Sequence, residues 1–338
     1  MNQTLNGIRR ILITILVAMG VGALFIVAIG ENPIDAYAAL FRGAFDGELR
    51  LGTTLAGFTP LLLTSIAFAV AAKAGAFNVG VEGEVFLGGI TAAYIGINWT
   101  FLPKPALYVA CFVGAMVVAA AWALIPAVLR AYYNVNEVCT TILMNTVALY
   151  ITSYLVSGPM SAGTANAQSL PVTVRLYQFM KPSSVNVGIF IAAITVIVII
   201  FMLQKSSWGY KIRTVGLNPT HADYVGIDSK KVFVGAMMLS GMLRGMAGCI
   251  EVLGVHGYFL NNFATGLGSN GMLAALIVKN NMVSTPFMAF FLAVLKSGAM
   301  GMQQSTGVPK SLVDTITAVF IIIATMETAF QFTKKRKK

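Results

Sequence analysis

Charged residues are scarce in this sequence. Asp, Glu, Lys and Arg together make up 10% of the 338 residues, whereas hydrophobic residues make up 57%. A soluble domain carries about a quarter charged residues, so this chain has too little polar surface to cover itself in water. The surplus apolar surface must face lipid. The sequence therefore predicts a protein that crosses a membrane several times, and it excludes an ordinary soluble domain.

Cysteine and histidine are also rare. The three cysteines, Cys111, Cys139 and Cys249, lie far apart in apolar stretches, which excludes a disulfide framework and the usual zinc spacings. The two histidines, His221 and His256, have no ligand or nucleophile spaced around them. No catalytic residue and no metal site is therefore predicted, and we do not expect an enzyme.

The sequence lacks two further motifs that bear on its partners. It has no G-x-x-x-x-G-K-[ST] motif, so we expect no cofactor in this chain, and any ATP and magnesium must be bound by a partner subunit. It also has no basic stripe interleaved with stacking aromatics, so the net charge of +11 does not indicate binding to nucleic acid. Lys and Arg beside membrane spans set topology instead.

Long apolar segments are what the chain does contain. A span requires roughly 20 mostly apolar residues, and about ten segments approach this length. The expected segments are 11–29, 51–72, 77–97, 106–129, 138–157, 186–203, 232–252, 272–278, 286–301 and 312–332. Segment 272–278 is too short to cross alone, and 31–50 is expected to be a polar loop. The prediction is an all-α transmembrane bundle that forms one domain over 1–338, with some segments broken or re-entrant.

The distribution of basic residues orients these segments. If ten segments cross, most of the 23 Lys and Arg residues fall on the side of the two chain termini. The positive-inside rule then places both termini in the cytoplasm. The same count places the polar loop 205–231 in the cytoplasm.

Loop 205–231 is the longest polar interruption in the second half of the chain. Asn218 can cap a helix N-terminus, and Pro219 suits the first helical turn because its missing N–H leaves no bond unmade. Gly226 can end the helix in a left-handed conformation. The pattern predicts a short helix on a basic loop, suited to docking a soluble partner. An ordinary cytoplasmic loop is the alternative.

Segment 77–84 places two carboxylates and two glycines where a span should begin. Buried ionisable groups in a membrane usually face a partner or a water-filled cavity, and glycines permit a broken helix beside such a cavity. The alternative is that Glu82 and Glu84 lie at the interface and cap a helix N-terminus beside Lys73. The residues themselves favour neither alternative.

A second small-residue pattern lies in segment 232–252. Gly241 and Gly245 form a G-x-x-x-G motif, which predicts close helix packing. Arg244 and Glu251 are seven residues apart and share a helix face, but two turns separate them. They could pair only through extended side chains or a third group.

Four blocks of sequence resemble a known family. The blocks are KAGAFNVGVEG at 73–83, VNEV at 135–138 with TILMN at 141–145, VGLNP at 215–219 with Ala222 and Gly226-Ile227, and GSNG at 268–271 through KNN at 279–281. In this order they resemble the permease subunits of bacterial ABC importers for nucleosides and simple sugars, whose relatives handle ribose and branched-chain amino acids. Two residues depart from the family pattern. Arg244 stands where a small or apolar residue is usual, and Lys279 stands where Arg is common.

The resemblance implies a multi-subunit importer in the plasma membrane of a bacterium. Its expected partners are an ATP-binding subunit, a second permease that is a paralogue of this chain, an extracellular substrate-binding lipoprotein and the lipid bilayer. The VEG form of the first block favours a small neutral nucleoside as substrate, with a ribose-like sugar as the alternative.

The resemblance also implies roles for particular residues. Loop 205–231 becomes the segment that couples the permease to the ATPase, and the expected contacts are Gly216, Asn218, Pro219, Ala222, Asp223, Tyr224, Gly226 and Ile227. Phe77, Asn78, Glu82 and Asn145 are expected on the substrate path. For Asn145, the alternative is a hydrogen bond to a neighbouring helix.

Two other classes of protein are weighed against an importer permease. A secondary transporter driven by protons or sodium would use Glu82 or Glu251 as its carrier site, but it leaves the basic loop without a function. A membrane enzyme would need a nucleophile or a metal cluster at the membrane surface, and the sequence has neither.

Overall fold

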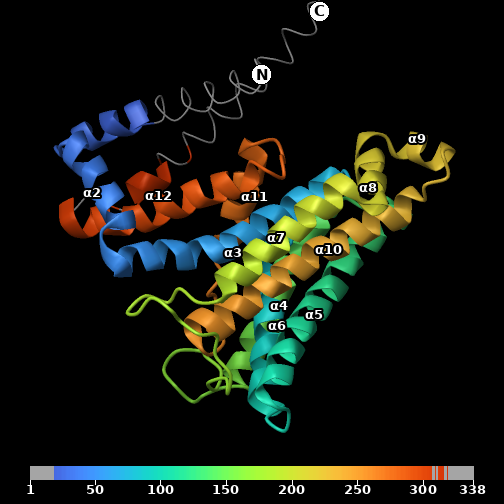
Figure 1. Ribbon diagram of the computed structural model, residues 1–338, viewed down its shortest axis with the longest axis horizontal. Helices are drawn as coiled ribbons and strands as arrows, with labels where there is room; N and C mark the ends of the chain where they lie inside the picture. The colour runs from blue at the N-terminus through green and yellow to red at the C-terminus, as the bar shows by residue number, and fades with distance from the viewer. Residues whose placement is uncertain (1–18, 307–308, 310, 316–317, 319–338) are drawn as a thin grey trace, which may run out of the picture. The chain divides into compact units, whose positions relative to one another are not determined.

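The computed structural model describes residues 19–306, 309, 311–315 and 318 (Figure 1). These residues form helices and loops without strands, apart from isolated bridges in and beside loop 158–187. The chain divides into two compact units. The first unit contains the residues up to Thr54 and those from Phe291 onward, and the second contains Leu55–Phe290. The prediction of a single domain stays a prediction.

The second unit holds most of the helices. They are α4 (Val81–Asn98), α5 (Lys104–Tyr133), α6 (Glu137–Ser157), α7 (Gly188–Lys205), α8 (Ser207–Leu217), α9 (Pro219–Tyr224), α10 (Ser229–Ile250), the π-helix η1 (Glu251–His256) and α11 (Leu267–Ile277). Helix α3 (Gly47–Lys73) runs from the first unit into the second, and α12 (Thr285–Thr306) runs from the second into the first. The first unit also contains α2 (Pro33–Phe45).

Six described helices are long and apolar enough to span a membrane. They are α3, α5, α6, α7, α10 with η1, and α12. A seventh is added if Met19–Ala28 and α2, which meet at a bend of 116°, form one span. The chain is thus an all-helical, multi-pass membrane protein. Helix α11 is short, as expected of segment 272–278, whereas segment 312–332 and residues 11–18 of the first expected segment lie almost wholly outside the described residues.

The expected polar loop 31–50 was wrong. The structure contains α2 here, and it begins with the same signal that marks the short helix in loop 205–231. Asn32 is the N-cap, and its side-chain oxygen accepts a hydrogen bond from the Ile34 amide at 3.0 Å, with Pro33 in the first turn. In the first unit, α2 packs closely on the end of α12, since a Cβ on Gly43 would lie 2.7 Å from the Gly301 Cα.

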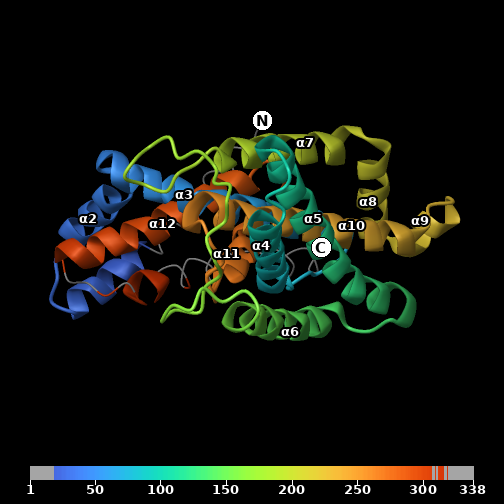
Figure 2. The same cartoon turned by 90° about the horizontal axis from the view of Figure 1, so that it is seen from below.

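Helix α10 lies at the centre of the second unit, where α4 and α5 flank it (Figures 1 and 2). The G-x-x-x-G prediction is confirmed by this packing. A Cβ on Gly241 would lie 2.6 Å from the Ala119 carbonyl oxygen, and a Cβ on Gly245 would lie 2.7 Å from the Ala119 Cβ. Small residues therefore let the backbones of α10 and α5 approach each other closely.

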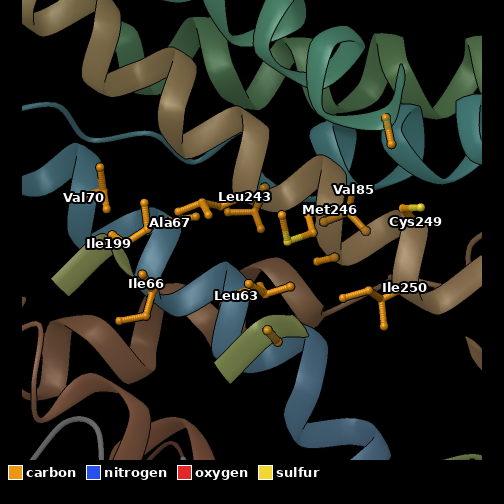
Figure 3. Packing of buried hydrophobic residues seen from close by; sticks show 14 of the residues in the cluster. Leu63, Ile66, Ala67, Val70, Val85, Ile199, Leu243, Met246, Cys249 and Ile250 are labelled. Atoms are coloured by element: carbon orange, nitrogen blue, oxygen red, sulfur yellow. The ribbon is translucent and has the colours of Figure 1, made fainter. Parts of the chain in front are cut away.

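A buried apolar cluster surrounds this contact (Figure 3). Figure 3 shows side chains of α3, α4, α7 and α10 pointing toward one another, among them Leu63, Val85, Ile199 and Leu243. The cluster fixes α3 and α4 against α10. It thereby fixes the two ends of the segment that joins α3 to α4, where the candidate site lies.

Candidate functional site

The chain between α3 and α4 is a helix break. Helix α3 ends at Lys73, Gly75 turns the chain with φ +80°, and α4 begins at Val81. A Cβ would strain this left-handed turn, so glycine suits position 75. Within a membrane, the backbone N–H and C=O groups of such a break need partners from the protein. In this structure side chains from α6 and α10 supply several of them.

A buried ion pair lies behind the break. The Arg244 Nη1 donates to the Glu84 Oε2 at 2.8 Å, and both side chains are buried. The Arg244 Nη2 donates to the backbone carbonyl of Asn78 at 2.9 Å. A buried guanidinium is tolerated only when it is paired and hydrogen-bonded, so Arg244 ties α10 to both α4 and the break.

The sequence reasoning missed this pair. It considered Glu251 as a partner of Arg244, whereas the structure places Glu251 3.6 Å from the His256 Nε2. The available signal was the charge of Arg244 and of Glu84 within predicted membrane segments, because charged side chains in a membrane usually pair with one another. For Glu84, the structure also excludes the cap at the interface, because its side chain is buried against Arg244.

Asn78 completes the buried network. Its Nδ2 donates to the Glu84 Oε1 at 3.0 Å and to the Ser240 hydroxyl at 3.4 Å. Its Oδ1 accepts from the Gly80 amide at 2.9 Å, which turns the chain toward α4. Asn78 is fully buried, so its role in this structure is to hold the break in shape. A place on the substrate path stays a prediction.

Asn145 of α6 holds the other side of the break. Its Oδ1 accepts from the Gly83 amide, and its Nδ2 donates to the Val79 carbonyl, each at 2.9 Å. The Thr141 hydroxyl accepts from the Val79 amide at 3.3 Å. Asn145 therefore makes the hydrogen bonds to a neighbouring segment that its alternative predicted, and its role on the path stays a prediction.

Glu82 and Phe77 complete the set of expected path residues. The Glu82 Oε1 accepts from the Gly266 amide at 2.9 Å, which links α4 to the start of α11. The Phe77 ring lies edge-on to Phe68, with centroids 5.1 Å apart, and the residue is 36% exposed. Phe77 is the most accessible of the four, and the structure groups all four at the break.

The short helix predicted in loop 205–231 is present as α9. The Asn218 side-chain oxygen accepts from the His221 amide at 3.0 Å, Pro219 occupies the first turn, and Gly226 follows the helix with φ +80°. These contacts confirm the predicted caps. The structure adds α8, an amphipathic helix whose Ile212 and Val215 are buried and which the sequence reasoning did not expect.

Helix α9 extends beyond α8 near the first turn of α10 (Figures 1 and 2). Tyr224 is 86% exposed, whereas Ala222 and Ile227 are buried and anchor the helix. The remaining expected contact residues are exposed: Gly216, Asn218, Pro219, Asp223 and Gly226. Six of the eight expected residues can therefore face a partner, and two cannot without rearrangement.

Among the described residues, no group of three or more His, Cys, Asp or Glu side chains is placed to hold a metal ion. Most polar groups at the break satisfy one another or the backbone, whereas the buried Arg244 Nε has no hydrogen-bond partner in the described part of the chain. The arrangement holds an irregular segment in shape among the helices, and it brings together no nucleophile and base.

Comparison with protein families identifies the chain. The family described as branched-chain amino acid transport system / permease component matches residues 50–325, which is most of the sequence.

The chain belongs to this permease family.

Three named permeases from other organisms are similar to this chain. The guanosine ABC transporter permease protein NupP of Bacillus subtilis is 32% identical, covering 97% of this chain and 95% of its own. The nucleoside ABC transporter permease protein NupB of Lactococcus lactis is 30% identical, over 95% and 91%. The glucose ABC transporter permease protein TsgB13 of Haloferax volcanii is 32% identical, over 92% and 85%. No solved structure matches the chain.

In this permease the four blocks of sequence that resembled the family meet at the helix break. The first block forms the break itself, and the second supplies Thr141 and Asn145. The third reaches it through Gly216, where an added Cβ would lie 2.8 Å from the Lys73 carbonyl carbon. The fourth reaches it through Gly268, where a Cβ would lie 2.9 Å from the Glu82 Cγ. Blocks as far apart in the sequence as 73–83 and 268–281 thus build one structure.

Proposed function

We propose that this chain is a permease subunit of an ATP-driven importer whose substrates are purine or pyrimidine nucleosides. The observation that carries the proposal is its similarity, over nine-tenths or more of both chains, to permeases named for guanosine and for nucleosides. A relative named for glucose is equally identical, so a sugar is the second candidate substrate.

The ATPase of this importer docks on α9 and its flanking residues. Three features support this role. The helix is capped at both ends by its own residues, Tyr224 is exposed, and the loop carries Lys and Arg on both sides. The proposed contacts are the six exposed residues among the eight expected from the sequence, and the buried Ala222 and Ile227 support them from beneath. ATP and magnesium are bound by the ATPase.

The substrate passes the helix break. Irregular backbone within a membrane is tolerated where it lines a water-filled path, and the segment from Phe77 to Glu82 is irregular and polar. Phe77 offers an aromatic surface for a base. Glu82 and Asn145 are half-buried, and they bond to Gly266 and to the Val79 carbonyl, respectively. Asn78 acts from behind, by holding the segment in shape.

The complete importer also contains a second permease, a paralogue of this chain, and an extracellular lipoprotein that delivers the substrate. We place both termini in the cytoplasm of a bacterial cell. About ten segments then enter the membrane, if α4, α11 and segment 312–332 are counted with the spans and the bent pair. The excess of Lys and Arg on the side of the termini supports this orientation.

Uptake measurements test the proposal. Cells that express the importer should accumulate radiolabelled guanosine only when this chain is present and its ATPase is intact. Excess unlabelled uridine or adenosine should compete, and excess glucose should not. Chain-dependent uptake of radiolabelled glucose without uptake of guanosine would replace the nucleoside with the sugar. Uptake that continues without the ATPase but collapses with the proton or sodium gradient would favour the secondary transporter.

A further inference from the structure

One glycine makes a close contact between the docking segment, residues 205–231, and the helix break. Gly216 lies at the end of α8 with its Cα against the last residue of α3. A Cβ at this position would overlap the Lys73 carbonyl oxygen and would lie 3.2 Å from the Gly75 amide nitrogen. From the other side, a Cβ on Gly75 would lie 3.7 Å from the Gly216 Cα. The two backbones therefore touch directly, without side chains between them.

The turn that Gly216 touches leads straight into the break. Ala74 and Ala76, on either side of Gly75, are 2% exposed, so the turn is held firmly in the core. Phe77 and Asn78 follow at once, and the Asn78 carbonyl is the acceptor of the Arg244 guanidinium. A displacement of the turn must therefore move Phe77, or strain the bond between Asn78 and Arg244.

On the other side, α8 and α9 are joined as one body. The Asn218 amide donates to the Thr214 carbonyl of α8 at 3.1 Å, while the Asn218 side chain caps α9. Helix α9 is tied to α10 as well, because the Asp223 carboxylate accepts from the amide and the hydroxyl of Ser229, each at 2.9 Å. A force applied to α9 therefore reaches Gly216 through a short, hydrogen-bonded path.

We infer that Gly216 is a positioning residue for transport, and that its backbone contact with Lys73 and Gly75 passes movement of α9 to the Phe77–Gly80 segment. The inference rests on the proposed docking of an ATPase at α9. It adds the route by which that docking changes the exposure of the substrate path. Glycine is required at position 216 because any side chain would separate α8 from the turn.

Replacing Gly216 with Ala tests the route. The variant is compared with Gly57→Ala in α3, since a Cβ on Gly57 meets nothing within 4 Å. Both are prepared as the complex with the ATPase, purified through a tag on this chain. We expect Gly216→Ala to lower nucleoside uptake at least tenfold. Its ATP hydrolysis should persist but lose stimulation by the loaded binding protein. Gly57→Ala should behave as the unaltered chain.

A reporter at the break supplies a readout that a merely structural role would not change. In a chain with Cys139→Ser, a cysteine is introduced in place of Phe77, and its rate of labelling by a maleimide is measured with and without nucleotide trapped on the ATPase. The two remaining native cysteines are buried. Trapping should change the labelling rate severalfold in the otherwise unaltered chain and should leave it unchanged with Gly216→Ala. Tyr94→Cys, at an exposed site far along α4, serves as the control.

The outcomes separate this inference from the proposed function. Full transport by Gly216→Ala, in a complex whose Tyr224→Cys still cross-links to the ATPase, would overturn the route and leave the docking intact. Failure of Tyr224→Cys to cross-link in the unaltered background would count against the docking itself. If Gly216→Ala does not assemble, the test uses the Phe77→Cys reporter in the otherwise unaltered chain. A labelling rate that is the same with and without trapped nucleotide would overturn the inference.

Discussion

The helix break and the docking segment are both interruptions of the helical structure, yet they are stabilised in opposite ways. At the break, the partners come from far along the chain, as when Arg244 of α10 bonds to Glu84 and to the Asn78 carbonyl. In the docking segment the partners are close in sequence. The Asn218 side chain accepts a hydrogen bond from the His221 amide, three residues away, and the Asp223 carboxylate accepts one from the Ser229 hydroxyl, six residues away. Ala74, Ala76, Asn78 and Gly80 of the break are buried, whereas much of the docking segment is exposed.

The difference follows from the solvent that each region meets. Water can satisfy any polar group that a surface loop leaves free, so local caps are sufficient there. Lipid offers no such partner, and an irregular segment among membrane helices must be satisfied by the protein itself. The break should therefore depend strongly on distant residues, and the docking segment only weakly on any one residue.

The largest effect is expected for Arg244→Met. Removal of the guanidinium leaves the Glu84 carboxylate buried without its partner, which costs about 3–5 kcal/mol in buried pairs. The free energy of unfolding, measured by denaturant titration in detergent, should fall by about this amount. The double variant Arg244→Met with Glu84→Gln removes both charges and should recover a substantial part of the loss. Equal stability of the single and double variants would show that the pair is not what makes Arg244 necessary.

A smaller effect is expected for Asn145→Leu. Leu has a similar volume but leaves the Gly83 amide and the Val79 carbonyl without their partner, at a cost of about 1–3 kcal/mol. The same unfolding titration measures it. Thr146→Ala, at an exposed position of the same helix, is the matched control and should change stability by less than about 0.5 kcal/mol. An equal loss in both variants would mean that α6 is sensitive as a whole and that Asn145 has no special role at the break.

In the docking segment, Asn218→Ala should have a local effect. Loss of the cap destabilises a helix by about 1 kcal/mol, and α9 has only six residues. Hydrogen exchange of the α9 amides should become severalfold faster, while exchange in α4 and α10 stays unchanged. Asn218→Asp keeps a capping oxygen and should restore slow exchange. Faster exchange at the break in Asn218→Ala would show that this cap stabilises more than α9 and would contradict its local role.

The smallest effect is expected for the pH dependence of hydrogen exchange at the start of α10. The pKa of the Asp228 carboxyl, which caps α10, lies below its ordinary value, chiefly because the Lys231 amide donates to the carboxylate. Because the pKa is lowered in the folded state, this cap contributes fully above the ordinary aspartate pKa and is lost as the pH falls through the lowered pKa. Hydrogen exchange in the first turn of α10, corrected for intrinsic rates, should quicken slightly between about pH 5 and about pH 3. Asp228→Asn should abolish this pH dependence.

The same comparison explains what the sequence could predict. Helix α9 was predictable because Asn218, Pro219 and Gly226 act within one short stretch, and Asn32 with Pro33 was an equal signal for α2 that a loop prediction overlooked. Helix α8 was missed because its Lys211 and Arg213 suggested a loop, although Ile212 and Val215 lie on one buried side.

The partners within the break were beyond local reasoning. Glycines and carboxylates in segment 77–84 allowed a broken helix as one of two alternatives, and an irregular segment is present between α3 and α4. However, Glu84 and Arg244 are 160 positions apart, and no spacing rule joins residues at that distance. Only the fold brings α4 and α10 together, through glycines that let their backbones approach.

One measurement tests most directly whether α9 is the docking site for a cytoplasmic ATPase. A single cysteine replaces Tyr224 in a chain with Cys139→Ser, and the buried Cys111 and Cys249 provide a low background. An impermeant thiol reagent should leave this cysteine unlabelled in intact cells. In inside-out vesicles the reagent should label it, and a bifunctional cross-linker should join it to the ATPase. Labelling of intact cells from outside would contradict both the orientation of the chain and the function proposed for α9.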